Sequence, residues 1–258
     1  MTLASPDLAE HTARRDARWR VVTAEHGVAS LLHTHWLDDE FRAYAGAPGR
    51  WARRDGRAVG RDLAQDAAAD SAEVALAPGQ DAIVGRLRLR AIDRDGALAL
   101  RVFDPDAPGR VGLRGILSFP RTDRWVIPGR FVAAATGERR LVRTVDGYER
   151  EEPAVGIIAL EIDGKPVRLT VSGGLDGFSA VIADGTSDHD AYRFRFLPVD
   201  RPGADGRVIV DFNRAYLPPC AFSEQYVCPL PPAGNRLAVR IEAGERIADR
   251  EPVLTDTY

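Results

Sequence analysis

The sequence is poor in cysteine and in long apolar runs. Only Cys220 and Cys228 occur among 258 residues, which is too few for a disulfide framework that replaces a hydrophobic core. No run approaches the roughly 18 uninterrupted apolar residues of a membrane-spanning helix, so no membrane partner is expected. The first residues lack a basic segment followed by an apolar run, so the sequence predicts no signal peptide and a cytoplasmic location.

An excess of charge of one sign is also missing. The formal net charge is -3, and this balance gives no reason to expect a nucleic-acid partner. Lys165 is the only lysine, so nearly all positive charge is carried by arginine. The coding bias of a GC-rich bacterial genome accounts for most of these arginines, and bidentate anion recognition is the alternative at individual positions.

The motifs of nucleotide-dependent enzymes and common hydrolases are absent as well. The sequence has no phosphate-binding P-loop, no Gly-x-Gly-x-x-Gly that opens a helix, no Gly-x-Ser-x-Gly and no His-Glu-x-x-His. Enzymes with these signatures are therefore disfavoured, and the sequence identifies no cofactor.

A helix signal is present near the N-terminus. Ser5 can cap a helix, and the Pro-Asp pair that follows suits its first turn. From Leu8 onward residues recur at helical spacing, and Gly27 can end the helix. We expect the helix to dock through Trp19 and Val22.

From about residue 82 the pattern changes to a period of two. Residues 83–92 and 97–103 alternate, and Asp95-Gly96 between them is typical of a hairpin turn, because both residues tolerate a positive φ. Further Asp-Gly pairs lie at 146–147, 163–164, 176–177, 184–185 and 205–206, and further strand-like runs lie at 157–162, 167–171 and 208–212. The sequence therefore predicts a mainly β fold, an antiparallel sandwich or barrel with an N-terminal α-helix.

The N-terminal third is less regular. Residues 28–44 form a dense apolar patch, whereas residues 45–80 are rich in Ala, Gly, Asp and Arg and have poor periodicity. The pattern is compatible with either a long surface excursion or weakly specified strands. We therefore expect residues 1–80 to be an N-terminal helix and poorly periodic segment, packed on an antiparallel β domain of residues 81–258 within one globular unit.

Residues 211–237 differ from the rest of the chain. This segment follows a strand and contains the pairs Pro218-Pro219 and Pro231-Pro232, both cysteines and several aromatic residues. Proline fixes φ and removes a hydrogen-bond donor, so the loop is expected to be stiff. Binding sites commonly lie on loops that a rigid scaffold holds in place.

This segment also carries a family resemblance. Asp-Phe-Asn-Arg-Ala-Tyr-Leu-Pro-Pro-Cys-Ala-Phe at 211–222, Cys-Pro-Leu-Pro-Pro at 228–232 and Asn-Arg-Leu at 235–237 resemble the C-terminal signature of an uncharacterised bacterial family, catalogued as domain of unknown function 1684. Residues 100–104, 115–120 and 156–170 are similar too. At 190–196 the family tends to have a glycine-rich run, whereas this chain has larger side chains. The resemblance implies no activity.

The polar and aromatic residues of the loop are candidates for a binding site. Arg214 and Arg236 would supply charge, tyrosines such as Tyr192 would form walls, and the other polar residues would donate or accept hydrogen bonds. The sequence thus predicts a small-molecule-binding β protein with an arginine-containing pocket at the 211–236 loop and a small polar or anionic ligand. The candidate ligand-binding residues are Asp211, Asn213, Arg214, Tyr216, Glu224, Tyr226, Asn235 and Arg236.

Two other functions remain open. The first is a hydrolase-type enzyme that uses Asp211 or His189 as its base. The second is a structural or partner-binding protein in which the loop plugs one end of a barrel. Asp211 and Asn213 would then satisfy backbone groups of the loop.

The two cysteines and two of the histidines are candidate metal ligands. Cys220 and Cys228 are compatible with two packed thiols, a loop-closing disulfide or half of a zinc site. Structural zinc needs four ligands, and no second pair of cysteines follows. His33 and His35 would face one side of a strand, a spacing that can hold a metal, but no third ligand completes the site. No metal site is therefore predicted.

Overall fold

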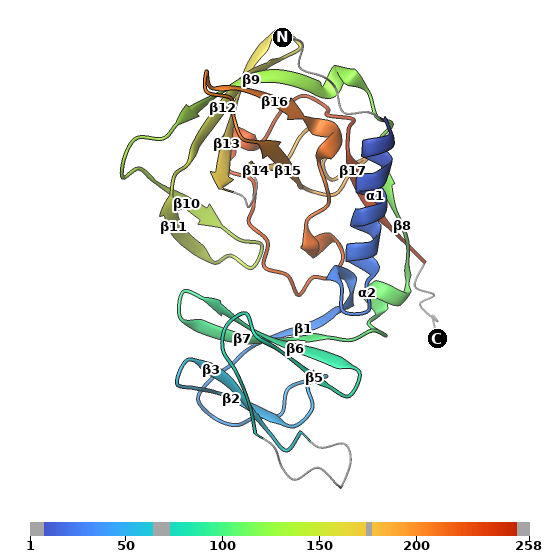
Figure 1. The fold of residues 1–258 in the computed structure, drawn as a ribbon, viewed down its shortest axis with the longest axis vertical. Helices are drawn as coiled ribbons and strands as arrows, with labels where there is room; N and C mark the ends of the chain where they lie inside the picture. The colour runs from blue at the N-terminus through green and yellow to red at the C-terminus, as the bar shows by residue number, and fades with distance from the viewer. Residues whose placement is uncertain (1–7, 64–72, 174–176, 252–258) are drawn as a thin grey trace. The chain divides into compact units, whose positions relative to one another are not determined.

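The computed structural model describes residues 8–63, 73–173 and 177–251. Two compact units make up the protein (Figure 1). The first comprises Met1–Arg14, Arg114–Ala221 and Val227–Arg250, and the second comprises Arg15–Leu113, Phe222–Tyr226 and Glu251–Tyr258. The chain passes from the second unit to the first at residues 113–114.

The first unit is built on a six-stranded antiparallel sheet. The strand order is β15-β14-β13-β12-β9-β16, and β15 and β16 lie close enough for the sheet to form a near-closed barrel (Figure 1). The strands are β9 (Val126–Ala133), β12 (Gly156–Ile162), β13 (Lys165–Gly173), β14 (Gly177–Ile182), β15 (Arg195–Asp200) and β16 (Arg207–Asp211).

Alternation along these strands produces the core of the first unit. Ile158 and Ile162 of β12 and Leu169 of β13 are buried on one face of the sheet. Trp125 packs edge-on against Phe212, with ring centroids 6.3 Å apart. Because every second residue points inward, an antiparallel strand can bury one face and leave the other to solvent.

Smaller elements complete the first unit. β10 (Arg139–Arg143) and β11 (Glu149–Pro153) form a hairpin, and β8 (Leu113–Ser118) pairs with β17 (Glu245–Arg250). The 3-10 turns are η2 (Asp123–Trp125), η3 (Phe212–Arg214), η4 (Pro219–Ala221) and η5 (Ala233–Asn235). Three of these turns, η3 to η5, shape the proline-rich loop.

The second unit contains two antiparallel sheets. One has the order β1-β7-β6-β5 and the other β2-β3-β4. Trp51, Leu89, Leu100 and Val102 are fully buried between them. The strands are β1 (Leu31–Trp36), β2 (Arg50–Arg54), β3 (Arg57–Arg61), β4 (Val74–Leu76), β5 (Asp81–Val84), β6 (Leu87–Arg94) and β7 (Ala97–Phe103). Strands β2 to β4 lie in the described part of residues 45–80. This segment therefore contains strands, the second of the two alternatives that the sequence left open.

The helices are few. α1 spans Leu8–Thr23, η1 spans Val28–Ser30 and α2 spans Pro108–Val111. Val22 of α1 is fully buried and Trp19 is half-buried. The predicted helix start at residues 5–7 lies outside the described residues. The prediction of a mainly β, antiparallel fold with an N-terminal helix is confirmed, and no described helix is long and apolar enough to cross a membrane.

The Asp-Gly pairs behave in different ways. Asp95 and Gly96 have φ values of 51° and 88° and join β6 to β7, as predicted. The predicted single strand over residues 83–92 is wrong. Gly85, with a φ of 57°, turns the chain between β5 and β6, so the run contains a hairpin. Asp184-Gly185 lies in the long connection between the paired strands β14 and β15 and does not form a two-residue hairpin turn, and the Asp184 side chain is buried in an ion pair.

That ion pair joins Arg195 to Asp184, and both side chains are fully buried. Arg195 Nη2 donates to the Asp184 carboxylate and to the Ile241 carbonyl (3.0 Å), and Nη1 donates to the Ala243 carbonyl. Asp184 Oδ1 accepts from Thr186 N (2.8 Å) and Oγ1 (2.7 Å). The pair therefore ties the end of β14 to the start of β15 and to the 241–243 segment.

We expect Arg195→Met to destabilise the first unit by about 3–5 kcal/mol, because the substitution leaves the buried Asp184 carboxylate without its counterion. Urea unfolding followed by circular dichroism measures the change. Arg207→Met is the matched control, since Arg207 pairs with Asp205 at the surface and should lose less than about 1 kcal/mol. Equal losses for the two variants would contradict the expectation.

Candidate functional site

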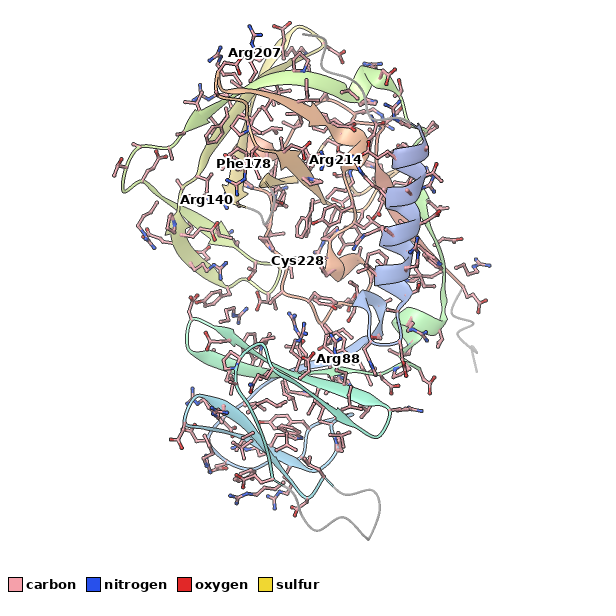
Figure 2. The ribbon with its side chains drawn as sticks, viewed as in Figure 1. Arg88, Arg140, Phe178, Arg207, Arg214 and Cys228 are labelled. Carbon is pink, nitrogen blue, oxygen red and sulfur yellow. The ribbon has the colours of Figure 1, made fainter. Side chains whose placement is uncertain are left out.

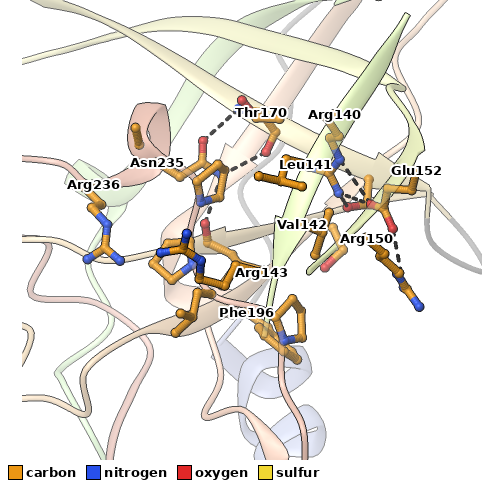
Figure 3. A pocket seen from close by; sticks show the side chains of 18 of the residues that line it. Arg140, Leu141, Val142, Arg143, Arg150, Glu152, Thr170, Phe196, Asn235 and Arg236 are labelled. Carbon is orange, nitrogen blue, oxygen red and sulfur yellow. Dashed lines mark hydrogen bonds and ion pairs between the residues drawn. The ribbon is translucent and has the colours of Figure 1, made fainter. Parts of the chain in front are cut away.

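A cavity of about 740 Å³ lies within the first unit. Three parts of the chain line it: the β10–β11 hairpin, the facing residues of β13, β14 and β15, and the loop from Pro229 to Arg236 (Figure 3). A volume of this size is typical of small-molecule sites, which range from roughly 300 to 1,000 Å³. This cavity is therefore the candidate functional site.

Part of the cavity wall is apolar. Phe196 of β15 and Val181 of β14 contribute from the sheet, and Val142 and Leu230 contribute from the hairpin and the loop. Phe196 is half-buried and packs edge-on against Tyr216, with ring centroids 5.7 Å apart. These side chains provide a surface for the apolar part of a ligand.

The polar side chains of the cavity are mostly arginines. Arg140, Arg143, Arg150 and Arg236 line it, and Glu152 is the acidic residue among the lining residues that the structure describes. Arg140 Nε donates to Glu152 (3.1 Å), and Arg150 lies 3.4 Å from the same carboxylate. In the view of Figure 3, Arg236 lies on the opposite side from this group. Four arginines and one glutamate are thus among the described residues that line the cavity.

Two of these arginines have further partners. Arg140 Nη2 also donates to Ser172 Oγ, and Arg143 Nε donates to Glu149 (2.6 Å). Arg236 differs, because the described residues provide its guanidinium with no hydrogen-bond or ion-pair partner. Its backbone is nevertheless held, since Arg236 N donates to Ala233 O (3.2 Å). An exposed cation on a fixed backbone is available to bind an anion.

Asn235 fixes the position of the loop. Its side chain is fully buried: Oδ1 accepts from Thr170 N (2.7 Å), and Nδ2 donates to Thr170 O (2.8 Å) and Val181 O (2.9 Å). Among the described residues, β13 and β14 pair directly at 172–173 and 178–179, and the amide joins the two strands further from their connecting turn. Asn235 therefore sets where the Arg236 backbone lies.

The loop also holds the hairpin. Leu230 N donates to Arg143 O (2.8 Å), and Val145 N donates to Cys228 O (2.9 Å). Thr144 forms an isolated antiparallel bridge with Pro229. Both the hairpin wall and the loop wall of the cavity are thus tied together by backbone hydrogen bonds.

Of the predicted site residues, Asn235 and Arg236 line this cavity, and the other six lie elsewhere. Asp211 and Asn213 bond to each other, since Asp211 Oδ1 accepts from Asn213 N (3.0 Å) and Nδ2 (2.8 Å). The Asn213 amide also exchanges hydrogen bonds with the Thr122 backbone at 3.0 and 3.1 Å. This Asp211 contact turns the chain into η3 and ends β16.

The remaining predicted residues are dispersed. Arg214, labelled in Figure 2, forms an ion pair with the exposed Asp200, with a distance of 2.8 Å between Nη1 and Oδ2. Tyr216 packs on Phe196 from outside the cavity lining. Glu224 and Tyr226 belong to the second unit, where Glu224 is exposed and the Tyr226 hydroxyl donates to Val28 O (3.2 Å).

The histidines are also apart from the cavity. His189 is exposed in the turn after Asp184, beside Asp190, whose pKa is lowered by a hydrogen bond from Arg240. His33 and His35 stack with ring centroids 5.1 Å apart, and burial lowers the pKa of His33. Within the described part of the chain, no group of three or more His, Cys, Asp or Glu side chains could hold a metal ion.

Sequence reasoning did not identify the arginines of the hairpin. Arg140, Arg143 and Arg150 flank the Asp146-Gly147 pair, in which Gly147 has a φ of 82°. The turn pair indicates a hairpin, and the register that it implies places Val142 opposite Arg150. That signal could have identified a cationic hairpin, although not its place against the proline-rich loop.

The fold is thus that of an antiparallel β protein whose first unit contains a cavity. A family described as protein of unknown function (DUF1684) matches residues 112–246, which is more than half of the chain. The protein belongs to this family, as the resemblance of the 211–237 segment indicates.

Two further comparisons were made. A search of curated proteins found no match to the chain. Among solved structures, the solution NMR structure of an uncharacterized protein of Haloarcula marismortui is similar, with 27% sequence identity and a TM-score of 0.42. The similarity covers 52% of this chain and 76% of that chain.

Replacing Asn235 with Ala is expected to lower the free energy of unfolding by about 2–4 kcal/mol, because buried groups of Thr170 and Val181 lose their partners. Asn235→Asp should cost at least as much, since it turns a carboxylate oxygen toward two carbonyls. Chemical unfolding measures both variants. A loss below about 0.5 kcal/mol for Asn235→Ala, the range of ordinary surface substitutions, would contradict a structural role.

Proposed function

We propose that the protein binds a small organic anion in the cavity between the β10–β11 hairpin and the 229–236 loop. The observation that carries this proposal is the guanidinium of Arg236, which is exposed at the cavity and has no partner among the described residues. The sequence predicts an arginine-containing pocket at the 211–236 loop. We propose that this pocket lies at residues 229–236, the end of that loop.

The charge of the cavity supports an anionic ligand. Four arginines and one glutamate line it, and Glu149, which pairs with Arg143 from outside, supplies a second carboxylate. Among the described residues, two positive charges therefore remain in excess. Arginine presents a planar set of donors that matches a carboxylate or a phosphate, and cationic clefts attract such groups.

The shape of the cavity supports a ligand with an apolar part. Phe196 and Val181 on the sheet face the opening, and Leu230 adds to the loop side. Small-molecule sites combine such walls with a few polar groups that fix orientation. We therefore propose a ligand with a carboxylate or phosphate group at Arg236 and a hydrocarbon part over Phe196.

The rigidity of the loop supports binding by a preformed site. Asn235 holds the loop to two strands, and Pro231 and Pro232 restrict φ just before it. A site that is already ordered loses little conformational entropy when the ligand binds. The prolines and Asn235 together explain why this part of the loop has a fixed shape.

Binding is tested with inorganic pyrophosphate and citrate as anionic probes. The probe that binds should raise the thermal unfolding midpoint above that in sodium chloride of equal ionic strength, since a ligand of the folded state stabilises it. Arg236→Gln should weaken binding by roughly 10- to 100-fold, the value of a charge-assisted hydrogen bond, as measured by isothermal titration calorimetry.

The control is Arg207→Gln, which removes a surface arginine of the same unit that lies outside the cavity lining. This variant should bind the probes as tightly as the unaltered protein. If neither probe stabilises the protein beyond the chloride reference, or if Arg236→Gln and Arg207→Gln bind equally, the proposed site is wrong.

A further inference from the structure

Both cysteines belong to the proline-rich loop. Cys220 is in η4 and Cys228 precedes Pro229, and both are buried free thiols with exposed fractions of 5%. The Cys228 side chain is a hydrogen-bond partner of the Cys220 side chain, although seven residues separate the two cysteines. The structure therefore contains a dithiol pair.

Polar groups surround the Cys220 side of the pair. The Tyr192 hydroxyl donates to the Cys220 carbonyl (3.1 Å) and lies within hydrogen-bond reach of its sulfur. The Arg193 guanidinium contacts the same sulfur and stacks 5.5 Å from the Tyr192 ring. These donors are arranged to stabilise a negative sulfur.

The donors change the acidity of one thiol. The hydrogen bond from Cys228 lowers the pKa of Cys220 to about 7, with further lowering by Tyr192 and Arg193, although burial opposes the shift. An ordinary cysteine has a pKa of about 8.5, so Cys220 is far more ionised near neutral pH. The thiolate is the reactive form of cysteine.

We propose that Cys220 and Cys228 are a reversible redox site, in which Cys220 attacks a hydroperoxide and Cys228 resolves the product to a disulfide. This inference is independent of the proposed anion site, because neither cysteine lines the cavity. It assigns the Cys220 sulfur the role of nucleophile and gives Tyr192 and Arg193 the role of stabilising its negative charge.

The reaction balances with hydrogen peroxide as the oxidant. The Cys220 thiolate attacks one peroxide oxygen, the O–O bond breaks, and the leaving hydroxide takes a proton to become water. The Cys228 sulfur then attacks the Cys220 sulfenic sulfur, the S–O bond breaks, and the hydroxide leaves as water with the Cys228 proton. Two thiols are oxidised by two electrons, one peroxide is reduced to two waters, and a small dithiol reverses the oxidation.

The position of the pair gives the disulfide a structural effect. Cys220 and Cys228 belong to the first unit, whereas residues 222–226 between them belong to the second. A disulfide would join the chain where it leaves the first unit to the point where it returns. The Cys228 carbonyl accepts a hydrogen bond from Val145 N. The disulfide would therefore also fix one end of the contact between the loop and the β10–β11 hairpin.

The test uses the full-length protein, treated with hydrogen peroxide and analysed by mass spectrometry of intact protein and peptides. The expected product is a Cys220–Cys228 disulfide, seen as the loss of two hydrogens and reversed by dithiothreitol. The rate of its formation should rise with pH and reach half of its limiting value near pH 7, following the ionisation of Cys220.

Two single variants distinguish the roles of the thiols. With peroxide and the sulfenic-acid reagent dimedone, Cys228→Ser should give an adduct at Cys220, whereas Cys220→Ser should give none at Cys228. Arg193→Met should slow the oxidation of the otherwise unaltered pair. Circular dichroism of each reduced variant establishes that it is folded, and the peptide analysis of the unaltered protein does not depend on any variant.

Several results would overturn the proposal. One is peroxide-treated protein in which both thiols stay free, and another is Cys220 oxidised to the sulfinic acid without a disulfide. Equal dimedone labelling of the two single variants would exclude Cys220 as the attacking group. Anion binding that fails in the calorimetric test while the disulfide forms would leave this inference intact.

Discussion

The buried ion pair of Arg195 and Asp184 is the interaction on which the first unit depends. It lies where β14 ends and β15 begins, and these strands supply Val181 and Phe196 to the cavity. Removing two charges from water is costly, and backbone carbonyls and the Thr186 hydroxyl offset part of this cost by hydrogen bonding to the pair. The sheet floor of the proposed site is therefore positioned by a polar network rather than by apolar packing alone.

Two asparagines extend the same principle to the proline-rich loop. Asn213 bonds to both backbone groups of Thr122, and Asn235 bonds to both backbone groups of Thr170. In each case a side-chain amide forms the pair of hydrogen bonds that the backbone of a neighbouring strand would otherwise form. A loop that contains so many prolines cannot satisfy these groups with its own backbone, and the amides compensate.

Local signals in the sequence predicted much of the fold and little of the site. Asp95-Gly96 marks a real hairpin, and the equivalent pair Asp55-Gly56, with positive φ at both residues, shows that the irregular N-terminal segment also held a readable turn. Asp184-Gly185 has the same local preference, yet neither residue has a positive φ, and the Asp184 carboxylate is paired with Arg195, eleven residues away. The cavity could not be predicted for the same reason, because Arg140 and Arg236 come to line one cavity only after the sheet has formed.

Residues 222–226 carry a consequence for how the protein can be divided. The Ser223 hydroxyl donates to Leu31 O (2.7 Å), and the Thr34 hydroxyl donates to Gln225 O (2.9 Å). Both partners precede residue 112, where the family match begins, although the match itself contains residues 222–226. A fragment cut to the family boundaries would present five residues of its most distinctive segment to solvent without their partners. The region by which the family is recognised is thus smaller than the region that must fold together.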